Sequence, residues 1–261
     1  MNLTFNAYRR TDPWGDMARP HLHGELELLL PLTDGDSIFI DNVSYPLRRG
    51  TLFLMDAGGP HRSRARKGQT YHRCILHFPW ETARALGAAE LPADHGCCAA
   101  LNEEELHRCS ALFERLTADA ATPAEALRRT AAFVELLALV ADKWSAPAET
   151  DLPAPADSTV AAVIAHIRSH LAQPLTLDAL AEQFFLSKSA LCHRFKAATG
   201  FTVMEYVILC RVRHAGALLR RGMSVREAGE ASGFGDNAHF IRTFRRITGM
   251  TPGQYAKEQK E

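Results

Sequence analysis

The feature that most constrains the fold is a pattern that occurs twice in the last third of the chain. Residues 195–202 (FKAATGFT) align with residues 244–251 (FRRITGMT), so that Phe, Thr, Gly and Thr recur at an offset of 49. Upstream, residues 177–181 correspond to residues 225–229 at an offset of 48. Two copies of such a pattern indicate a duplicated module rather than a repeat array, which needs at least three stacked units for stability.

Each copy predicts a helix, a tight turn and a second helix. Apolar residues in both helices recur at spacings of three and four, as in an amphipathic helix. The expected N-caps of the four helices are Thr176, Ser187, Ser224 and Asp236. Gly200 and Gly249 occupy positions typical of the glycine that ends a helix by adopting the left-handed backbone conformation. The sequence therefore predicts helix–turn–helix units over residues 175–200 and 224–249.

The second helix of each unit has an outer face that mixes basic, hydrogen-bonding and small apolar residues. In the first copy these are Ser187, Lys188, Ser189, Cys192, His193 and Lys196. In the second copy they are Asn237, Ala238, Ile241, Arg242, Arg245 and Arg246. Such a mixture suits the DNA major groove, because Arg pairs with guanine edges, Asn pairs with adenine and apolar groups touch thymine methyls. The alternative is that both are solvated faces of ordinary helices, since short helical pairs are common.

The residue types divide the expected DNA contacts into base contacts and phosphate contacts. We expect bases to be contacted chiefly by Arg242 and His193, with help from Asn237, Ser189 and Cys192. We expect phosphates to be held by Lys188, Lys196, Arg245 and Arg246. Arg211 and Arg213, on the helix expected between the two units, are assigned to packing or to phosphate contacts.

The charge distribution agrees with a polyanionic partner for the C-terminal part. From Asp157 onward there are 14 Lys and Arg against 9 Asp and Glu, whereas residues 1–156 hold 16 against 21. The formal net charge of zero therefore combines a basic part of +5 with an acidic part of −5. A basic domain of this kind is typical of nucleic-acid binding.

The stretch from Leu175 to Tyr255 resembles the double helix–turn–helix domain of AraC-type (AraC/XylS) transcription regulators. The matching segments are LTLDALA (175–181), LSKSAL (186–191), FKAATG (195–200), GFGD (233–236) and FRRITGMTPGQY (244–255). The resemblance implies a sequence-specific regulator and not an enzyme, with double-stranded DNA as partner and RNA polymerase as a second partner if it activates. The family usually has Ile-Ala where this chain has Ala228-Gly229, and a glycine inside a helix predicts a less rigid second unit.

The first eighty residues predict short strands separated by turns. The expected strands cover residues 26–32, 37–40, 43–47, 51–55 and 71–78. A hairpin turn is expected at Asp41-Asn42. Many short, closely spaced strands favour an antiparallel barrel or sandwich.

His21, His23 and Glu27 would face the same side of a strand, because side chains alternate along a strand. With His61 they resemble the paired motifs of the cupin barrel, and AraC-type regulators often carry such a barrel for a small-molecule effector. The pattern most resembles the subgroup that senses sugars or related metabolites. Arg73 and His77 are weaker pocket candidates, and Tyr8 and Trp14 are placed where they could close its mouth.

Three interpretations of this set remain open. The four residues could hold Fe, Mn, Ni, Co or Zn, which accept imidazole and carboxylate ligands. They could instead line a polar pocket that binds effector hydroxyls, or be structural histidines without a ligand. Ala65 and Asp56 depart from the cupin pattern, which argues against metal. A rival function is a metal-dependent cupin enzyme, such as a dioxygenase or isomerase, with an appended helical domain.

The expected fold is therefore α+β in two domains, a cupin-like antiparallel barrel with a helical hairpin and an all-α DNA-binding domain. The expected divisions are a barrel over 1–80, a helical dimerisation subdomain over 81–145, a linker over 146–157 and the DNA-binding domain over 158–261. Two helices over 103–120 and 122–144 would form the hairpin, and their spare apolar surface would join a homodimer.

Composition points to a cytoplasmic protein. The N-terminus lacks the apolar segment of a signal peptide, and the longest apolar run, residues 133–141, is too short to span a membrane. The six cysteines form no CxxC pair and are expected to be reduced thiols, although a redox role for Cys97 or Cys98 is an alternative.

Overall fold

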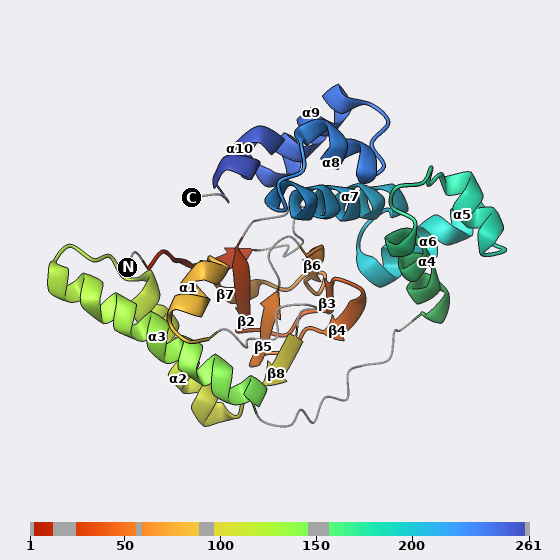
Figure 1. Cartoon of the computed structure of the whole chain (residues 1–261). Helices are drawn as coiled ribbons and strands as arrows, with labels where there is room; N and C mark the ends of the chain where they lie inside the picture. The colour runs from red at the N-terminus through yellow and green to blue at the C-terminus, as the bar shows by residue number, and fades with distance from the viewer. Residues whose placement is uncertain (1–2, 13–24, 56–58, 89–96, 146–156, 259–261) are drawn as a thin grey trace.

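The computed structural model describes residues 3–12, 25–55, 59–88, 97–145 and 157–258 (Figure 1). The strands are β1 (Asn6–Asp12), β2 (Leu26–Pro31), β3 (Ser37–Ile40), β4 (Val43–Pro46), β5 (Thr51–Met55), β6 (His61–Arg64), β7 (Tyr71–Phe78) and β8 (Cys97–Ala100). The helices of the N-terminal part are α1 (Trp80–Ala85), α2 (Glu103–Thr117) and α3 (Pro123–Ser145). Those of the C-terminal part are α4 (Ser158–Ser169), α5 (Leu177–Gln183), α6 (Lys188–Thr199), α7 (Val203–Arg220), α8 (Val225–Ala231), α9 (Asn237–Thr248) and α10 (Pro252–Glu258).

The strands form two antiparallel sheets, ordered β1-β7-β2-β5-β8 and β4-β3-β6. Alternation along β7 separates two cores, because neighbouring side chains point to opposite faces. Leu76 and Phe78 pack in one core with α2 and α3, while Tyr71 and Ile75 pack in the other with residues of both sheets. The α+β prediction with a cupin-like sheet domain and a helical C-terminal region is confirmed.

Three of the strands, β1, β6 and β8, were not predicted from the sequence. β1 and β6 lie among polar residues with little apolar alternation, and β6 contains only His61, Arg62, Ser63 and Arg64. β8 falls where helices alone were expected, and it pairs with β5 at the edge of the larger sheet. Pairing with an existing edge, rather than intrinsic propensity, accounts for such strands.

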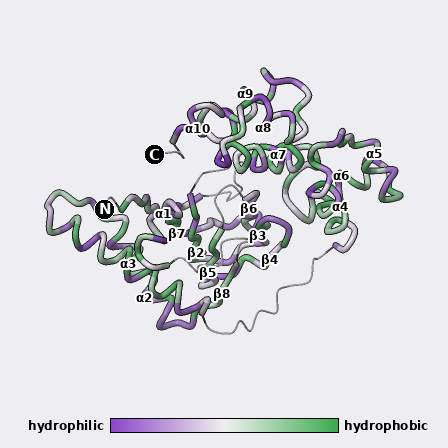
Figure 2. Tube along the Cα trace, viewed as in Figure 1, coloured by the Kyte–Doolittle hydropathy of each residue, from purple (hydrophilic) through white to green (hydrophobic). Residues whose placement is uncertain are grey.

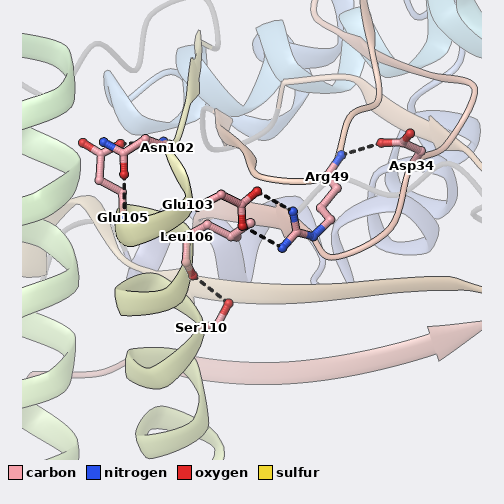
Figure 3. Close-up of polar contacts among 7 residues, drawn as sticks. All are labelled: Asp34, Arg49, Asn102, Glu103, Glu105, Leu106 and Ser110. Atoms are coloured by element: carbon pink, nitrogen blue, oxygen red, sulfur yellow. Dashed lines mark hydrogen bonds and ion pairs between the residues drawn. The ribbon is translucent and has the colours of Figure 1, made fainter.

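The helical hairpin follows the sequence prediction closely. Asn102 caps α2 in a capping box with Glu105. One face of α2 is buried, and it consists of Leu106, Cys109, Leu112, Phe113 and Leu116. Arg49, in the turn before β5, ties the barrel to α2 through a two-pronged pair with Glu103, at 2.8 and 3.2 Å (Figure 3). Hydrophobic and hydrophilic residues alternate along α2 and α3, as expected for helices with one buried face (Figure 2).

Both helix–turn–helix units are present, and α7 joins them (Figure 1). The four predicted N-caps accept hydrogen bonds from the first turn of α5, α6, α8 and α9. Gly200 and Gly249 end α6 and α9 with φ of 79° and 81°. Of the described residues, none belongs to a helix long and apolar enough to cross a membrane.

Gly229, expected to make the second unit less rigid, also has a packing role. A Cβ added at Gly229 would lie 2.8 Å from Cδ1 of Phe240, so the absence of a side chain lets the Phe240 ring pack directly on α8. Phe240 is fully buried and stacks edge-on with Phe244 at 5.6 Å. The glycine therefore allows closer contact between α8 and α9 than alanine would.

We expect Gly229→Ala to destabilise the chain by about 1–3 kcal/mol, because overpacking outweighs the better helix propensity of alanine. Chemical denaturation of the purified protein would measure the change. Gly253→Ala is the matched control, since a Cβ at Gly253 in α10 meets nothing within 4 Å. An increase in stability for both variants would contradict the packing explanation.

Phe185 occupies the turn between α5 and α6 in an unfavourable backbone conformation. Its φ is 54°, in the left-handed region that suits glycine, and its side chain is 96% exposed. The corresponding residue of the second unit is Gly233, with φ of 83°. The phenylalanine is therefore strained without gaining burial.

We expect Phe185→Gly to raise the free energy of unfolding by up to about 1 kcal/mol, since it relieves this strain and removes little packing. Phe185→Ala is the control, because it removes the ring and keeps Cβ. Thermal unfolding should separate the two variants. Equal stabilities for the glycine and alanine variants would show that backbone strain is not the reason.

Candidate nucleic-acid interface and effector site

The outer face of α6 is available for contact with DNA. Leu191, Phe195 and Thr199 are buried on its inner side. Ser187, Lys188, Ser189, His193 and Lys196 are exposed on the other, and Cys192 is half-buried at the margin. Lys188 pairs with Asp178 of α5 at 2.8 Å, but both side chains are largely exposed, so this pair is weak and can exchange for a phosphate.

The outer face of α9 has the same geometry and more positive charge. Phe240, Thr243, Phe244 and Ile247 are buried. Asn237, Ala238, Arg242, Arg245 and Arg246 are exposed, while Ile241 is half-buried against the helical core. Across the described part of the chain, no salt bridge involves any of the three arginines. Among the described residues, nothing therefore neutralises the charges of these three arginines.

The two faces correspond residue by residue at the offset of 49. Ser189, His193 and Lys196 occupy the positions of Ala238, Arg242 and Arg245. All six are exposed. The predicted base-contacting residues His193 and Arg242 are thus equivalent, which is the arrangement expected if both helices dock in the same way.

Three further basic residues of the helical domain have internal roles. Arg194, on α6, forms a two-pronged pair with Asp157 at 2.9 and 2.8 Å, which anchors the start of α4. Arg211 donates to the carbonyls of Leu171 and Gln173. Arg213 pairs with Asp41 of the barrel at 2.8 Å. Arg211 and Arg213 were expected to support packing or to contact phosphates, and the contacts that they make within the protein match the packing role.

Glu27 and His61 meet inside the barrel, together with His77. Glu27 Oε2 lies 3.4 Å from His61 Nε2 and 3.0 Å from His77 Nε2. Glu27 and His61 are only 4% and 3% exposed. Burial opposes protonation of His61, but the charge and hydrogen bond of Glu27 and the Gly59 carbonyl prevail and raise its pKa. A buried acid–imidazole cluster therefore lies between the sheets, with His77 a closer partner of Glu27 than the sequence suggested.

Tyr71 and Arg73 share the inner face of β7 with His77. Arg73 Nη2 contacts Asp12 of β1 at 2.7 Å, and the guanidinium lies 4.8 Å from the centre of the Tyr71 ring. Within the described residues, Tyr71 Oη and Arg73 Nη1 are buried and have no hydrogen-bond partner. Buried polar atoms are costly when unpaired, so these two are the candidate ligand contacts of β7. Tyr71 was not predicted as a site residue, because its place in the alternating pattern of the strand is that of an ordinary core residue.

His21, His23 and Trp14 lie outside the described residues. Among the residues that are described, no three His, Cys, Asp or Glu side chains form a group that could hold a metal ion. Tyr8 is exposed and lies edge-on to His77 at 5.8 Å.

Three thiols of the N-terminal domain, Cys74, Cys98 and Cys109, are poorly suited to redox sensing. Burial raises the pKa of Cys98, and it raises the pKa of Cys74 to about 11 and of Cys109 to about 12. Reactivity requires the thiolate, which a raised pKa disfavours. This weakens the alternative of a redox role for Cys98.

Comparison with known proteins agrees with a helix–turn–helix domain at the C-terminus and a ligand-binding domain at the N-terminus. Residues 2–137 match the family model described as an AraC-like ligand binding domain, and residues 180–258 match a helix-turn-helix domain. The chain therefore belongs to the AraC family of DNA-binding transcription regulators, with an N-terminal ligand-binding domain. The matched proteins are regulators, so the metal-enzyme alternative receives no support.

Similar proteins include the HTH-type transcriptional activator RhaR of Salmonella schwarzengrund, 36% identical over 110 residues, or 41% of this chain and 39% of the relative. The same values describe RhaR of Salmonella typhi. The chain thus covers well under half the length of these curated relatives. Among solved structures, ToxT from Vibrio cholerae O395 is 14% identical over 98% of this chain and 97% of that one, with a TM-score of 0.40. The DNA-binding domain of AdpA in complex with a target DNA is 28% identical over 39% of this chain and 93% of that one, with a TM-score of 0.38.

Proposed function

We propose that this protein is a sequence-specific transcription regulator that places α6 and α9 in successive major-groove segments of one DNA face. Successive segments lie about 34 Å apart, and one linking helix, α7, joins the two units. The observation that carries the proposal is the pair of equivalent exposed faces with unneutralised arginines on α9. The name of the relatives favours activation, in which case RNA polymerase is a second partner.

Selection from a random duplex pool with the full chain tests this proposal. We expect enrichment of a site with two separated half-elements, and affinity for it that falls steeply with salt as counterions are released. Failure to enrich any sequence, at low and moderate salt alike, would contradict sequence-specific binding.

For the N-terminal domain we propose a small polar effector with several hydroxyls and an anionic group, such as a sugar acid. Glu27 and His77 offer acceptors and donors for hydroxyls, and the free Nη1 of Arg73 suits a carboxylate. The hydroxyl of Tyr71 supplies a further contact. Neutral sugars are the alternative occupants. A divalent metal held by Glu27 and His61 with His21 and His23 is a second alternative.

A thermal-shift panel of neutral sugars, the corresponding sugar acids and divalent metal salts distinguishes these occupants. We expect sugar acids to raise the melting temperature of the wild-type chain and to lose this effect in Arg73→Ala. Arg84→Ala is the control, since Arg84 is an exposed residue of α1. A shift with neutral sugars that survives Arg73→Ala would rule out the anionic class, and a shift reversed by chelator would favour metal.

We also propose that α3 mediates a homodimer. Leu127 and Val134, seven residues apart on one face of α3, are 71% and 40% exposed. Large apolar side chains exposed on one face of a helix suit packing against a partner. Sedimentation of Leu127→Glu should show a monomer where the wild type is a dimer, and an unchanged dimer would place the interface elsewhere.

A further inference from the structure

The smaller sheet, β4-β3-β6, separates the inside of the barrel from the DNA-binding domain. Its inner face consists of Ile38, Ile40, Tyr45, His61 and Ser63, all buried. Its outer face carries the alternating residues Phe39, Ser44, Arg62 and Arg64. Because neighbouring residues of a strand point to opposite faces, each inner residue is covalently joined to an outer one.

The outer face of this sheet contacts the C-terminal end of α6. Ser44 Oγ donates to the Ala198 carbonyl at 2.7 Å, Arg62 Nη1 to the Gly200 carbonyl at 2.6 Å and Arg64 Nη1 to the Ala197 carbonyl at 2.8 Å. Carbonyls at the end of a helix lack partners within the helix, and the negative end of its dipole favours cations. Side chains of the barrel therefore supply the hydrogen-bond donors for the carbonyls at the C-terminus of α6.

The centre of this contact is apolar and belongs to the core of the helical domain. Phe39 is 3% exposed and lies edge-on to Phe201 at 5.8 Å and to Tyr206 at 6.0 Å. Arg62 covers Gly200, where an added Cβ would lie 3.0 Å from the arginine Cδ. The two domains thus share one packed core at this point.

The β3–β4 turn adds a buried ion-pair cluster. Asp41 has φ of 57° and is 4% exposed. Its carboxylate contacts Arg168 of α4 at 3.0 Å and Arg213 of α7 at 2.8 Å. Its carbonyl accepts a hydrogen bond from the Tyr206 hydroxyl at 2.8 Å. Three residues of two helices, α4 and α7, therefore hold the turn.

We infer that the β4-β3-β6 sheet couples the effector site to the first helix–turn–helix unit, a conclusion that rests on the proposed function of both sites. His61, inside the barrel beside Glu27, is the neighbour of Arg62, which holds Gly200. A ligand that displaces the Glu27–His61 pair moves β6, and β6 moves the end of α6. The contact leaves Ser189, His193 and Lys196 exposed, so it orients α6 and does not cover its DNA-facing side.

A double-mutant cycle tests this coupling without knowledge of the effector. His61→Gln and, separately, Glu27→Gln alter the pocket, and Arg62→Ala with Arg64→Ala cuts the outer contact. Affinity for the selected duplex is measured by fluorescence anisotropy in every combination, with circular dichroism to verify folding. Arg66→Ala, an exposed arginine just beyond β6, replaces the double arginine change as the matched control.

We expect each pocket change to shift the affinity of the wild-type chain by about fivefold or more, the usual lower range of coupling between sites. In the chain without Arg62 and Arg64 the shift should fall below about twofold, and with Arg66→Ala it should persist. Equal shifts in both backgrounds, or no shift in the wild-type chain, would overturn the coupling. Absence of any selected duplex would instead refute the proposed DNA-binding function.

If either pocket variant fails to fold, hydrogen exchange gives a second test. Amides of residues 197–202 should exchange faster when Arg62 and Arg64 are replaced than in the Arg66→Ala chain, because the carbonyls that end α6 lose their donors. Unchanged exchange there would show that the sheet does not hold α6 in solution, and the inference would be wrong.

Discussion

Replacing Arg242 with alanine should remove most of the discrimination between the selected duplex and random DNA. Arg242 is exposed at the centre of the outer face of α9, and in the described structure no carboxylate neutralises it. A two-pronged arginine contact to guanine is worth about 1–3 kcal/mol of discrimination. The ratio of specific to random affinity should therefore fall by about 5- to 150-fold.

Arg245→Ala is the contrasting variant, because Arg245 is assigned to phosphate. It should weaken binding to both duplexes by a similar factor and reduce the slope of log affinity against log salt by about 1. Titrations of both variants at several salt concentrations would separate the two roles. If Arg242→Ala left the ratio of specific to random affinity unchanged, the assignment of Arg242 to base recognition would be wrong.

Asp41→Asn should produce the second large effect, by loosening the contact between the domains. Asparagine tolerates the left-handed conformation at this turn and keeps the size of the side chain. It removes a buried negative charge and breaks the ion pairs that Arg168 and Arg213 form with Asp41. Removing one member of a buried pair costs about 3–5 kcal/mol, but both arginines are partly exposed and can rehydrate, so about 2 kcal/mol is expected.

Hydrogen exchange over residues 203–213 measures this change, since Tyr206 and Arg213 lie there and contact Asp41. Asp119→Asn is the control, an exposed aspartate beyond the end of α2. Protection lost only in Asp41→Asn would support the role of Asp41. Equal exchange in both variants would mean that the ion pairs contribute little to holding the domains together.

The proposed effector site could be predicted only in part from the sequence. Glu27 and His61 were predicted from their resemblance to the cupin motifs, and the structure brings them together. His77 was ranked below them, yet it lies closer to Glu27, and Tyr71 was not considered. Strand pairing places Glu27 opposite His77, and pairing between distant strands is not evident from the residues of either one.

Local sequence patterns were enough to define the helix–turn–helix units, their caps and the faces of α6 and α9. These features depend on residues three or four positions apart, so local periodicity and capping chemistry define them. The contacts of Asp41, Arg62 and Arg213, in contrast, depend on the folded arrangement of the two domains. Their partners lie 127 to 172 residues away along the chain, and short-range patterns carry no information about such contacts. The same holds for Gly229, whose packing role depends on how closely α9 approaches α8.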